Sequence, residues 1–145
     1  FNTAVWLDSN NYHQKYSNFD AILAVDAVSS IEITSENAFS RLKKYQTNIE
    51  DYIFGYLSYD LKNDVEDLKS DNFDGFHFPD LFFFQPKKLF FIKKNTVEIK
   101  YLSNYKNEIN ADLQHIYKTS TSHPDTIEFK DENNIKIKQR NSIRI

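Results

Sequence analysis

The chain has 145 residues, 40% of them hydrophobic with 13 Phe and 9 Tyr, so it can bury a core and is not disordered by composition. It has no cysteine and only two glycines, which excludes disulfides, thiolate chemistry, cysteine metal sites and a glycine-rich phosphate loop. Its net charge of −3 argues against a nucleic-acid partner, and no apolar run approaches the roughly 20 residues that cross a bilayer.

The start of the chain suggests a longer parent protein. There is no methionine, even at position 1, which predicts a fragment or a processed form. Residues 1–7 have no basic segment and no long apolar run, so they do not form a signal peptide. Together with the lack of cysteine, this favours the reducing cytoplasm.

Three strands are predicted before residue 35. Ala4–Leu7 is a short apolar run that is closed by turn-forming Asp, Ser and Asn residues. Asp20–Val28 is rich in apolar residues, and Ser30–Thr34 alternates apolar and polar residues on a period of two. We expect the last two runs to form an antiparallel hairpin that turns at Ala27–Ser30.

A helix is expected to begin at Ser35, with Ser35 or Thr34 as its N-cap. Asp51–Tyr59 follows as an aromatic strand, and Gly55 in its middle indicates a bulge or a close backbone approach. Leu61–Leu68 can form a short amphipathic helix, and a polar loop comes after it.

Three further strands are predicted at Leu81–Phe84, Lys88–Lys93 and Thr96–Leu102. Lys94-Asn95 between the last two is a two-residue hairpin turn, in which Asn95 tolerates a positive φ.

The C-terminal part combines one helix with one strand. Asn107–Tyr117 has amphipathic helical spacing, Lys118–Pro124 is a Ser- and Thr-rich linker, and Asn134–Lys138 alternates like a strand. Gln139–Ile145 has no partner in sequence, so residues 118–145 are interpreted as an exit toward a further domain. No regular strand–helix–strand repeat is present, so we predict an α+β fold, mostly antiparallel β-sheet with a few short flanking helices.

No catalytic constellation is evident from the residue types. The histidines are scattered, without the i, i+4 spacing of a helical metal site: His13, His77, His115 and His123. Asp64 and Asp67 can share a helix face, as two-carboxylate chemistry requires, but we interpret them with Glu66 as a solvated acidic face. Ser9 has no glycine near it and so lacks a nucleophile elbow.

Aromatic residues crowd two predicted strands, in Phe82-Phe83-Phe84 and Phe90-Phe91. About half of these rings must point away from any one core. Either both faces of the sheet are covered, or one face docks onto another domain or protein.

Several stretches, taken in order, resemble the N-terminal domain of the chorismate-utilising synthases. They are Trp6-Leu7-Asp8-Ser9 with Tyr16-Ser17-Asn18-Phe19-Asp20, then Phe54–Leu61, Val65–Leu68 and Phe78–Leu81. Large components of aminodeoxychorismate synthase have a Leu-x-Ser turn, Tyr-Ser-x-Phe-Asp, a strand ending in Tyr-Asp-Leu, Phe-Glu-x-Leu and a Pro-Asp step in this order. The chain departs from the family in having fewer glycines before Tyr-Asp-Leu, and Asp8 stands where related enzymes can have Glu or His.

The resemblance implies that residues 1–145 are the N-terminal regulatory and scaffolding domain of aminodeoxychorismate synthase component I, in folate and para-aminobenzoate biosynthesis. The complete enzyme, a transferase, converts chorismate and ammonia to 4-amino-4-deoxychorismate. It uses Mg²⁺ in a C-terminal chorismate-binding domain and ammonia from a glutamine amidotransferase subunit. This chain would hold no cofactor and no catalytic residue, and its partners would be that domain and that subunit.

The same resemblance implies a tryptophan pocket in this domain. By motif match its lining would be Leu7, Asp8, Ser9, Tyr16, Ser17 and Phe19. Asp8 can pair with the ligand ammonium, Ser9 can hold polar groups, and the aromatic rings can sandwich an indole. The alternative is a purely structural turn that joins two strands.

Other functions remain as alternatives. Anthranilate synthase component I, of tryptophan biosynthesis, shares the resemblance, although the Tyr-Ser-x-Phe-Asp form favours the aminodeoxychorismate branch. A stand-alone protein-interaction module would use the Phe-rich strands. A metal-dependent hydrolase built on Asp64 and Asp67 is the least favoured.

Overall fold

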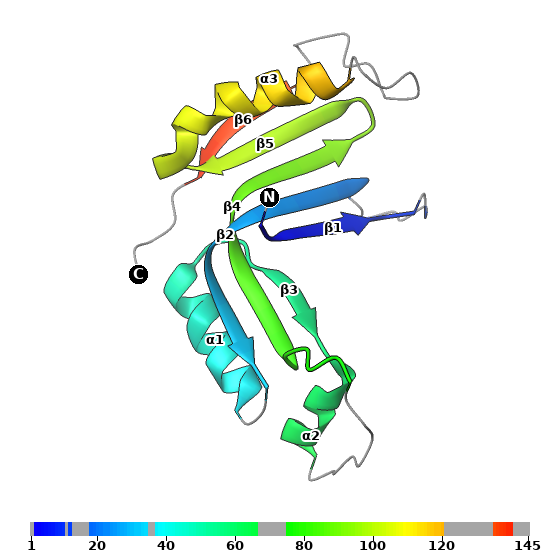
Figure 1. Ribbon diagram of the computed structural model, residues 1–145, viewed down its shortest axis with the longest axis vertical. Helices are drawn as coiled ribbons and strands as arrows, with labels where there is room; N and C mark the ends of the chain where they lie inside the picture. Colours follow the sequence, from blue (N-terminus) through cyan, green and yellow to red (C-terminus); the bar gives the residue numbers. More distant parts are fainter. Residues whose placement is uncertain are drawn as a thin grey trace. The chain divides into compact units, whose positions relative to one another are not determined.

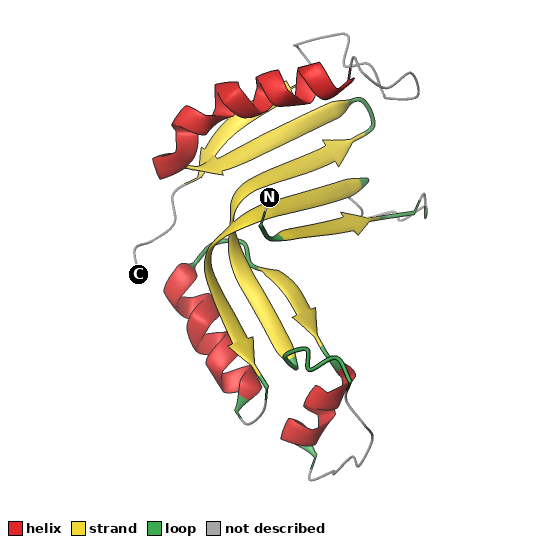
Figure 2. Ribbon diagram, in the orientation of Figure 1, coloured by secondary structure: helices red, strands yellow, loops and turns green. Residues whose placement is uncertain are grey.

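The computed structural model describes residues 2–10, 12, 18–34, 37–66, 75–120 and 135–140. Within them the fold is α+β, as predicted, and one sheet has the strand order β1-β2-β4-β5-β6, with β3 paired to β4 (Figures 1 and 2). In chain order the elements are β1 (Ala4–Asp8), β2 (Ala21–Ile33), α1 (Ala38–Ile49), β3 (Phe54–Leu57), the 3-10 helix η1 (Tyr59–Leu61), α2 (Lys62–Val65), β4 (Leu81–Lys93), β5 (Thr96–Leu102), the 3-10 helix η2 (Ser103–Glu108), α3 (Ile109–Ser120) and β6 (Ile135–Arg140).

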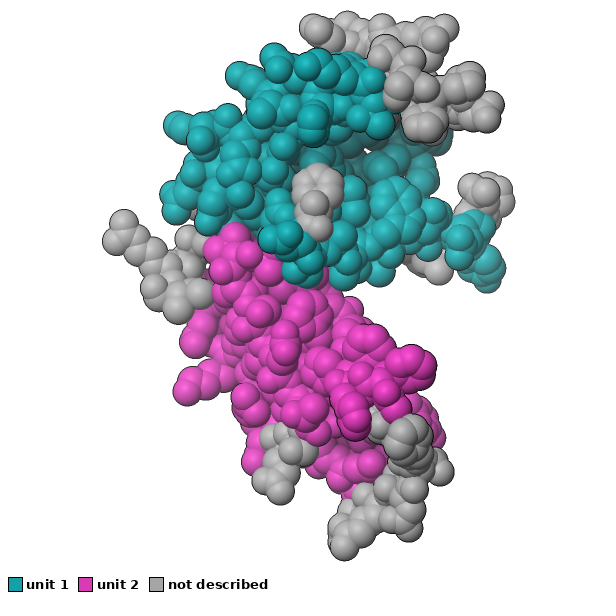
Figure 3. All heavy atoms as spheres, in the orientation of Figure 1, with its two compact units in different colours: residues 1–26, 87–141 teal, residues 27–86, 142–145 magenta. Residues whose placement is uncertain are grey.

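The chain divides into two compact units, coloured separately in Figure 3. Unit 1 comprises Phe1–Asp26 with Lys87–Asn141, and unit 2 comprises Ala27–Pro86 with Ser142–Ile145. Both long strands, β2 and β4, therefore contribute residues to each unit.

Unit 1 is built from β1, the first part of β2, the second part of β4, β5, β6 and α3. β1 pairs antiparallel with β2, β4 pairs antiparallel with β5, and β6 adds to β5 in parallel. Apolar residues of β2, β4, β5 and α3 form its core, with α3 lying along the strands (Figure 1). The core residues are Val25, Phe90, Ile99, Tyr101 and Ile109, with Leu23, Val97, Leu113 and Ile116 packed against them.

Unit 2 has a smaller core under α1. Ile33, Ala38, Leu61 and Leu81 are buried together, and Ile31, Leu42 and Phe83 pack against them. β3 pairs with the first part of β4, from Phe54↔Phe84 to Leu57↔Leu81.

Gly55 lies in the middle of β3, and the close approach predicted there is confirmed. A Cβ at this position would stand 1.8 Å from the carbonyl oxygen of Phe82 and 2.7 Å from the Cα of Phe83. Only a residue without a side chain fits.

The hairpin predicted at Ala27–Ser30 is wrong, because β2 runs without a turn from Ala21 to Ile33. The polar residues that suggested a turn have partners in the sheet and on α1. The Asp26 N–H donates to the carbonyl of Thr3 at 2.9 Å, and the Ser29 hydroxyl lies 2.9 Å from the hydroxyl of Tyr45.

The separation of Leu81–Phe84 from Lys88–Lys93 is also wrong, since both belong to the single strand β4. This strand changes partners along its length, from β3 to β5. Two of the polar residues that interrupt the apolar pattern of β4 have side-chain partners from other segments. The side-chain amide of Gln85 donates to Asp51 at 2.8 Å, and the ammonium of Lys88 lies 2.5 Å from Asp112.

The start of α1 lies later than predicted, at Ala38. Ser35 is outside the described residues and Thr34 lies in a bend, while Asn37 precedes the helix with a φ of 60° and makes no side-chain cap. The cap comes from Asp64, whose carboxylate accepts the N–H groups of Asn37 and Ala38 at 2.8 Å each.

At the C-terminal side the predictions hold in outline. The Lys94-Asn95 turn is present, but the positive φ of 50° belongs to Lys94 and not to Asn95. α3 continues to Ser120, so the linker predicted from Lys118 does not begin there, and residues 121–134 and 141–145 lie outside the described part. Gln139, expected in the exit segment, belongs to β6.

Candidate functional site

The structure brings together the described members of the predicted pocket. Leu7, Asp8, Ser9 and Phe19 line one cavity of about 250 Å³ in unit 1. Asn18, Asp20, Ala21 and Ile22 also line it among the residues that the structure describes. Tyr16 and Ser17, the other two predicted pocket residues, lie outside the described residues.

The end of β1 and the start of β2 position this cavity. Their register places Asp8 opposite Ala21, and the Ser9 N–H donates to the carbonyl of Asp20 at 2.9 Å. The Asp8 carboxylate also shapes its own turn, since it accepts the Asn10 N–H at 2.7 Å and the Trp6 indole N–H at 3.3 Å. Asp8 remains exposed, and a carboxylate can accept further hydrogen bonds.

Phe19 forms the apolar wall of the cavity. Its ring packs on that of Phe91, with the two centroids 4.7 Å apart and the planes tilted by 45°. Phe91 is a buried strand residue, whereas Phe19 is half-buried. The sheet thus holds the ring of Phe91 in place, and the ring of Phe91 supports that of Phe19.

A second cavity, of about 280 Å³, also has Phe19 in its lining. It is lined by Phe19, Phe91, Lys93, Lys94, Thr96 and Glu98, which come mainly from the β4–β5 hairpin. Because Phe19 lines both cavities, they are neighbours within unit 1.

Asp20 lines the first cavity and is hydrogen-bonded to Lys94, which lines the second. It was not predicted as a site residue. Its N–H donates to the carbonyl of Ile92 at 2.8 Å, and its carboxylate accepts the Lys94 N–H at 2.5 Å. Two sequence signals could have identified it: Asp side chains commonly bond backbone N–H groups at turns, and Asp20 closes the Tyr16–Asp20 motif. Its partner in the hairpin lies 74 residues away in sequence.

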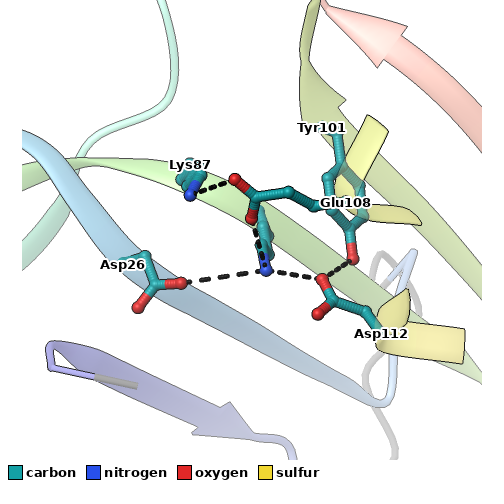
Figure 4. A network of polar contacts seen from close by, with 6 residues as sticks. Asp26, Lys87, Tyr101, Glu108 and Asp112 are labelled. Atoms are coloured by element: carbon teal, nitrogen blue, oxygen red, sulfur yellow. Dashed lines mark hydrogen bonds and ion pairs between the residues drawn. The ribbon is translucent and has the colours of Figure 1, made fainter. Parts of the chain in front are cut away.

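A polar network lies elsewhere in unit 1, around Lys88 (Figure 4). The Lys88 ammonium is 2.5 Å from Asp112, 3.0 Å from Glu108 and 3.9 Å from Asp26, and its side chain is only 5% exposed. The Tyr101 hydroxyl donates to the same Asp112 carboxylate at 2.6 Å.

The pKa values of Lys88 and Tyr101 are both raised in this network. Burial alone would lower the pKa of Lys88, but hydrogen bonds to Asp112 and Glu108 outweigh it and raise the pKa. Burial raises the pKa of Tyr101, and its bond to Asp112 raises it further. Through Asp112, the contacts of Lys88 and Tyr101 join β4 and β5 to α3.

The other candidates from the sequence have structural roles or lie at the surface. Asp64 caps α1, whereas Asp67 is outside the described residues. His77 and His115 are exposed, and His13 and His123 lie outside the described part. Among the residues that the structure describes, no group of three His, Asp or Glu side chains is arranged to hold a metal ion.

The sequence left open whether both faces of the Phe-rich strands are covered or one face docks onto another domain or protein. The burial of these Phe residues fits neither alternative completely. Phe84, Phe90 and Phe91 are buried, while Phe82 and Phe83 are half-buried. Six of the exposed large apolar side chains belong to the stretch of unit 2 between residues 56 and 78: Tyr56, Leu57, Tyr59, Val65, Phe76 and Phe78.

Compared with models of protein families, with curated proteins and with solved structures, the chain matches none. Across the described residues, no helix has the length and apolar character that crossing a membrane requires.

Proposed function

We propose that this chain is the N-terminal regulatory and scaffolding domain of an aminodeoxychorismate synthase component I, and that it binds tryptophan or a similar aromatic amino acid. One observation supports this above all. Leu7, Asp8, Ser9 and Phe19, which the motif resemblance singles out, line a single cavity although Phe19 is ten residues beyond Ser9 in sequence.

The chemistry of the cavity suits an aromatic amino acid. Asp8 offers an exposed carboxylate to the ligand ammonium, and the ring of Phe19 offers an apolar surface to an indole. The Ser9 hydroxyl lies beside them as a further polar group. In this proposal Asp8 keeps its turn-forming bonds and binds the ligand through its remaining acceptor sites.

Catalysis is assigned to a chorismate-binding domain outside these 145 residues, with ammonia from a glutamine amidotransferase subunit, and the setting is the cytoplasm. Mg²⁺ would act in that domain. The described residues of this chain provide no cluster that fits a metal, so no step assigned to this chain involves Mg²⁺. The roles of this chain are to bind the amino acid and to support its neighbours.

Titration calorimetry with tryptophan tests the binding role. We expect saturable binding to the wild-type chain, weakened about tenfold or more by Asp8→Ala because the ligand ammonium loses a charged partner. Asp60→Ala removes an exposed carboxylate in unit 2 and serves as the control. No heat at millimolar tryptophan would remove the pocket and leave the family assignment to be judged separately.

The family assignment has its own test. The complete enzyme, supplied with chorismate and ammonia, should form 4-amino-4-deoxychorismate. Formation of anthranilate would place it in the anthranilate synthase branch instead, and formation of neither would contradict the assignment.

A stand-alone interaction module is the second candidate, favoured by the exposed apolar side chains between residues 56 and 78. Phe76 and Phe78 are 83% and 69% exposed, and their rings stack 6.1 Å apart. This candidate predicts self-association of the chain that Phe76→Ser and Phe78→Ser abolish. A clean monomer by size-exclusion chromatography with light scattering, at all concentrations, would count against it.

A further inference from the structure

We infer that the cavity beside the β4–β5 turn is the carboxylate-binding half of the amino-acid site, with Lys93 and Lys94 as the cations. This inference rests on the proposed function and extends it across Phe19. The ligand class it defines is an aromatic zwitterion, or an aromatic carboxylate in the second cavity alone.

The two cavities are lined by residues of opposite charge. Asp8 and Asp20 line the first cavity, whereas Lys93 and Lys94 line the second. Among the described lining residues of the second cavity the acid is Glu98, which is paired with Lys100 at 3.2 Å, so its charge is already balanced. The rim of the second cavity is therefore positive, which suits a carboxylate.

Lys93 and Lys94 are well placed to bind an anion. Both side chains are exposed, and neither takes part in a salt bridge with another described residue. Each ammonium has three donors, and the nearby Thr96 hydroxyl adds another. A ligand carboxylate would thus find several donors within one small cavity.

The aromatic ring of the ligand would contact the apolar lining. Phe91 is only 3% exposed, and the ammonium of Lys100 lies 4.4 Å from its ring centroid, so this ring is already covered. Phe19 is the aromatic residue that reaches both cavities. A ligand ring is expected to pack on Phe19, with its ammonium toward Asp8 and its carboxylate toward Lys93 and Lys94.

Each cavity is small for a ligand pocket. At about 250 and 280 Å³, each falls below the typical lower bound of about 300 Å³ for a small-molecule pocket. The inference therefore requires a ligand that contacts residues of both. Asp20 holds the walls in place, because its backbone and side chain bond to Ser9, Ile92 and Lys94.

Three ligands separate the two halves of the site in calorimetry on the full chain. Tryptophan carries both charges, tryptamine only the ammonium, and indole-3-propionate only the carboxylate. The double variant Lys93→Gln/Lys94→Gln should weaken tryptophan and indole-3-propionate about tenfold or more and leave tryptamine unchanged. Asp8→Asn should show the opposite pattern, weakening tryptophan and tryptamine only.

The control is Lys43→Gln/Lys44→Gln, which removes the same charge from two exposed residues of α1. Unchanged circular dichroism and melting temperature establish that each variant folds. If tryptophan binds and Asp8→Asn weakens it while the Lys93 and Lys94 variant has no effect, the inference is overturned and the proposed function stands. If indole-3-propionate binds in a lysine-dependent way and tryptophan does not, the carboxylate site stands and the proposed tryptophan-binding role fails. Absence of binding by all three ligands overturns both the carboxylate site and that binding role.

Discussion

Gly55 illustrates how a single residue limits this sheet. Its backbone is not in the left-handed region, so the requirement for glycine is steric and not conformational. The carbonyl of Phe82 occupies the space that a side chain would need. β3 can approach β4 in this way only because position 55 has no Cβ.

We therefore predict that Gly55→Ala lowers the free energy of unfolding by about 3 kcal/mol, because the clashing atoms belong to the backbone of β4, which cannot move aside without a cost in free energy. Urea denaturation followed by circular dichroism measures this. The same substitution at exposed Gly75 should change stability by less than about 0.5 kcal/mol. Equal effects at the two positions would contradict the steric explanation.

Glu108 carries a charge effect that is also local. A hydrogen bond from Lys87 lowers the pKa of this carboxyl, and Lys88 lowers it further against the opposing effect of burial. A carboxyl whose pKa is lower in the folded state stabilises the fold above its unfolded pKa and loses this contribution as the pH falls through the folded pKa.

Stability should therefore decrease as the pH falls from the ordinary glutamate pKa of 4.5 toward the lower folded value, and Glu108→Gln should reduce that decrease. Urea midpoints measured between neutral and acid pH test this. Glu66→Gln, at an exposed position of unit 2, is the control. An unchanged pH profile in Glu108→Gln would show that the ion pairs with Lys87 and Lys88 do not stabilise the fold.

At the level of elements, α1 depends on a residue from another segment for its start. The carboxylate of Asp64 accepts the N–H groups of Asn37 and Ala38, and a negative charge at this end also favours the helix dipole. α1 has no acidic residue in its own first turn and no side-chain cap from Asn37. α2, which carries Asp64, and α1 thus stabilise each other.

Asp64→Ala should lower stability by about 1 kcal/mol and increase amide exchange in the first turn of α1. Hydrogen exchange at Ala38–Arg41 reports the local effect. Glu66→Ala, two residues further on and exposed, should leave this exchange unchanged. If both substitutions act alike, the effect comes from net charge and not from the cap.

For the molecule as a whole, the division into two units is the main feature. The core around Phe90 and Tyr101 belongs to unit 1, and the core around Ile33 and Leu81 belongs to unit 2. The candidate site and the Lys88 network both lie in unit 1, while the α1 cap and the exposed apolar residues between 56 and 78 lie in unit 2.

Substitutions in different units that share no partner should have additive effects. The stability loss of Asp64→Ala combined with Glu108→Gln should equal the sum of the single losses within about 0.5 kcal/mol. A double-mutant cycle in urea measures this. A larger coupling energy would mean that the cap and the network depend on each other.

Much of the fold follows from local patterns. Apolar alternation and helical spacing predicted strands and helices near their observed places, and Gly55 signalled the close approach of two backbones. These features depend on residues that lie close in sequence, so their periodicity and order carry the information. The pocket residues came instead from the family resemblance; Leu7, Asp8, Ser9 and Phe19 line one cavity, and amino-acid binding there stays a prediction.

The errors concern contacts between residues far apart in sequence. Polar residues inside β2 and β4 resembled turns because their partners, such as Tyr45 for Ser29, are not their neighbours. Asp64 caps a helix that begins 26 residues before it, and Asp20 bonds a turn 74 residues after it. Hydrogen bonds over such separations leave no local pattern, because they form only when the packed sheet brings the donor and the acceptor together.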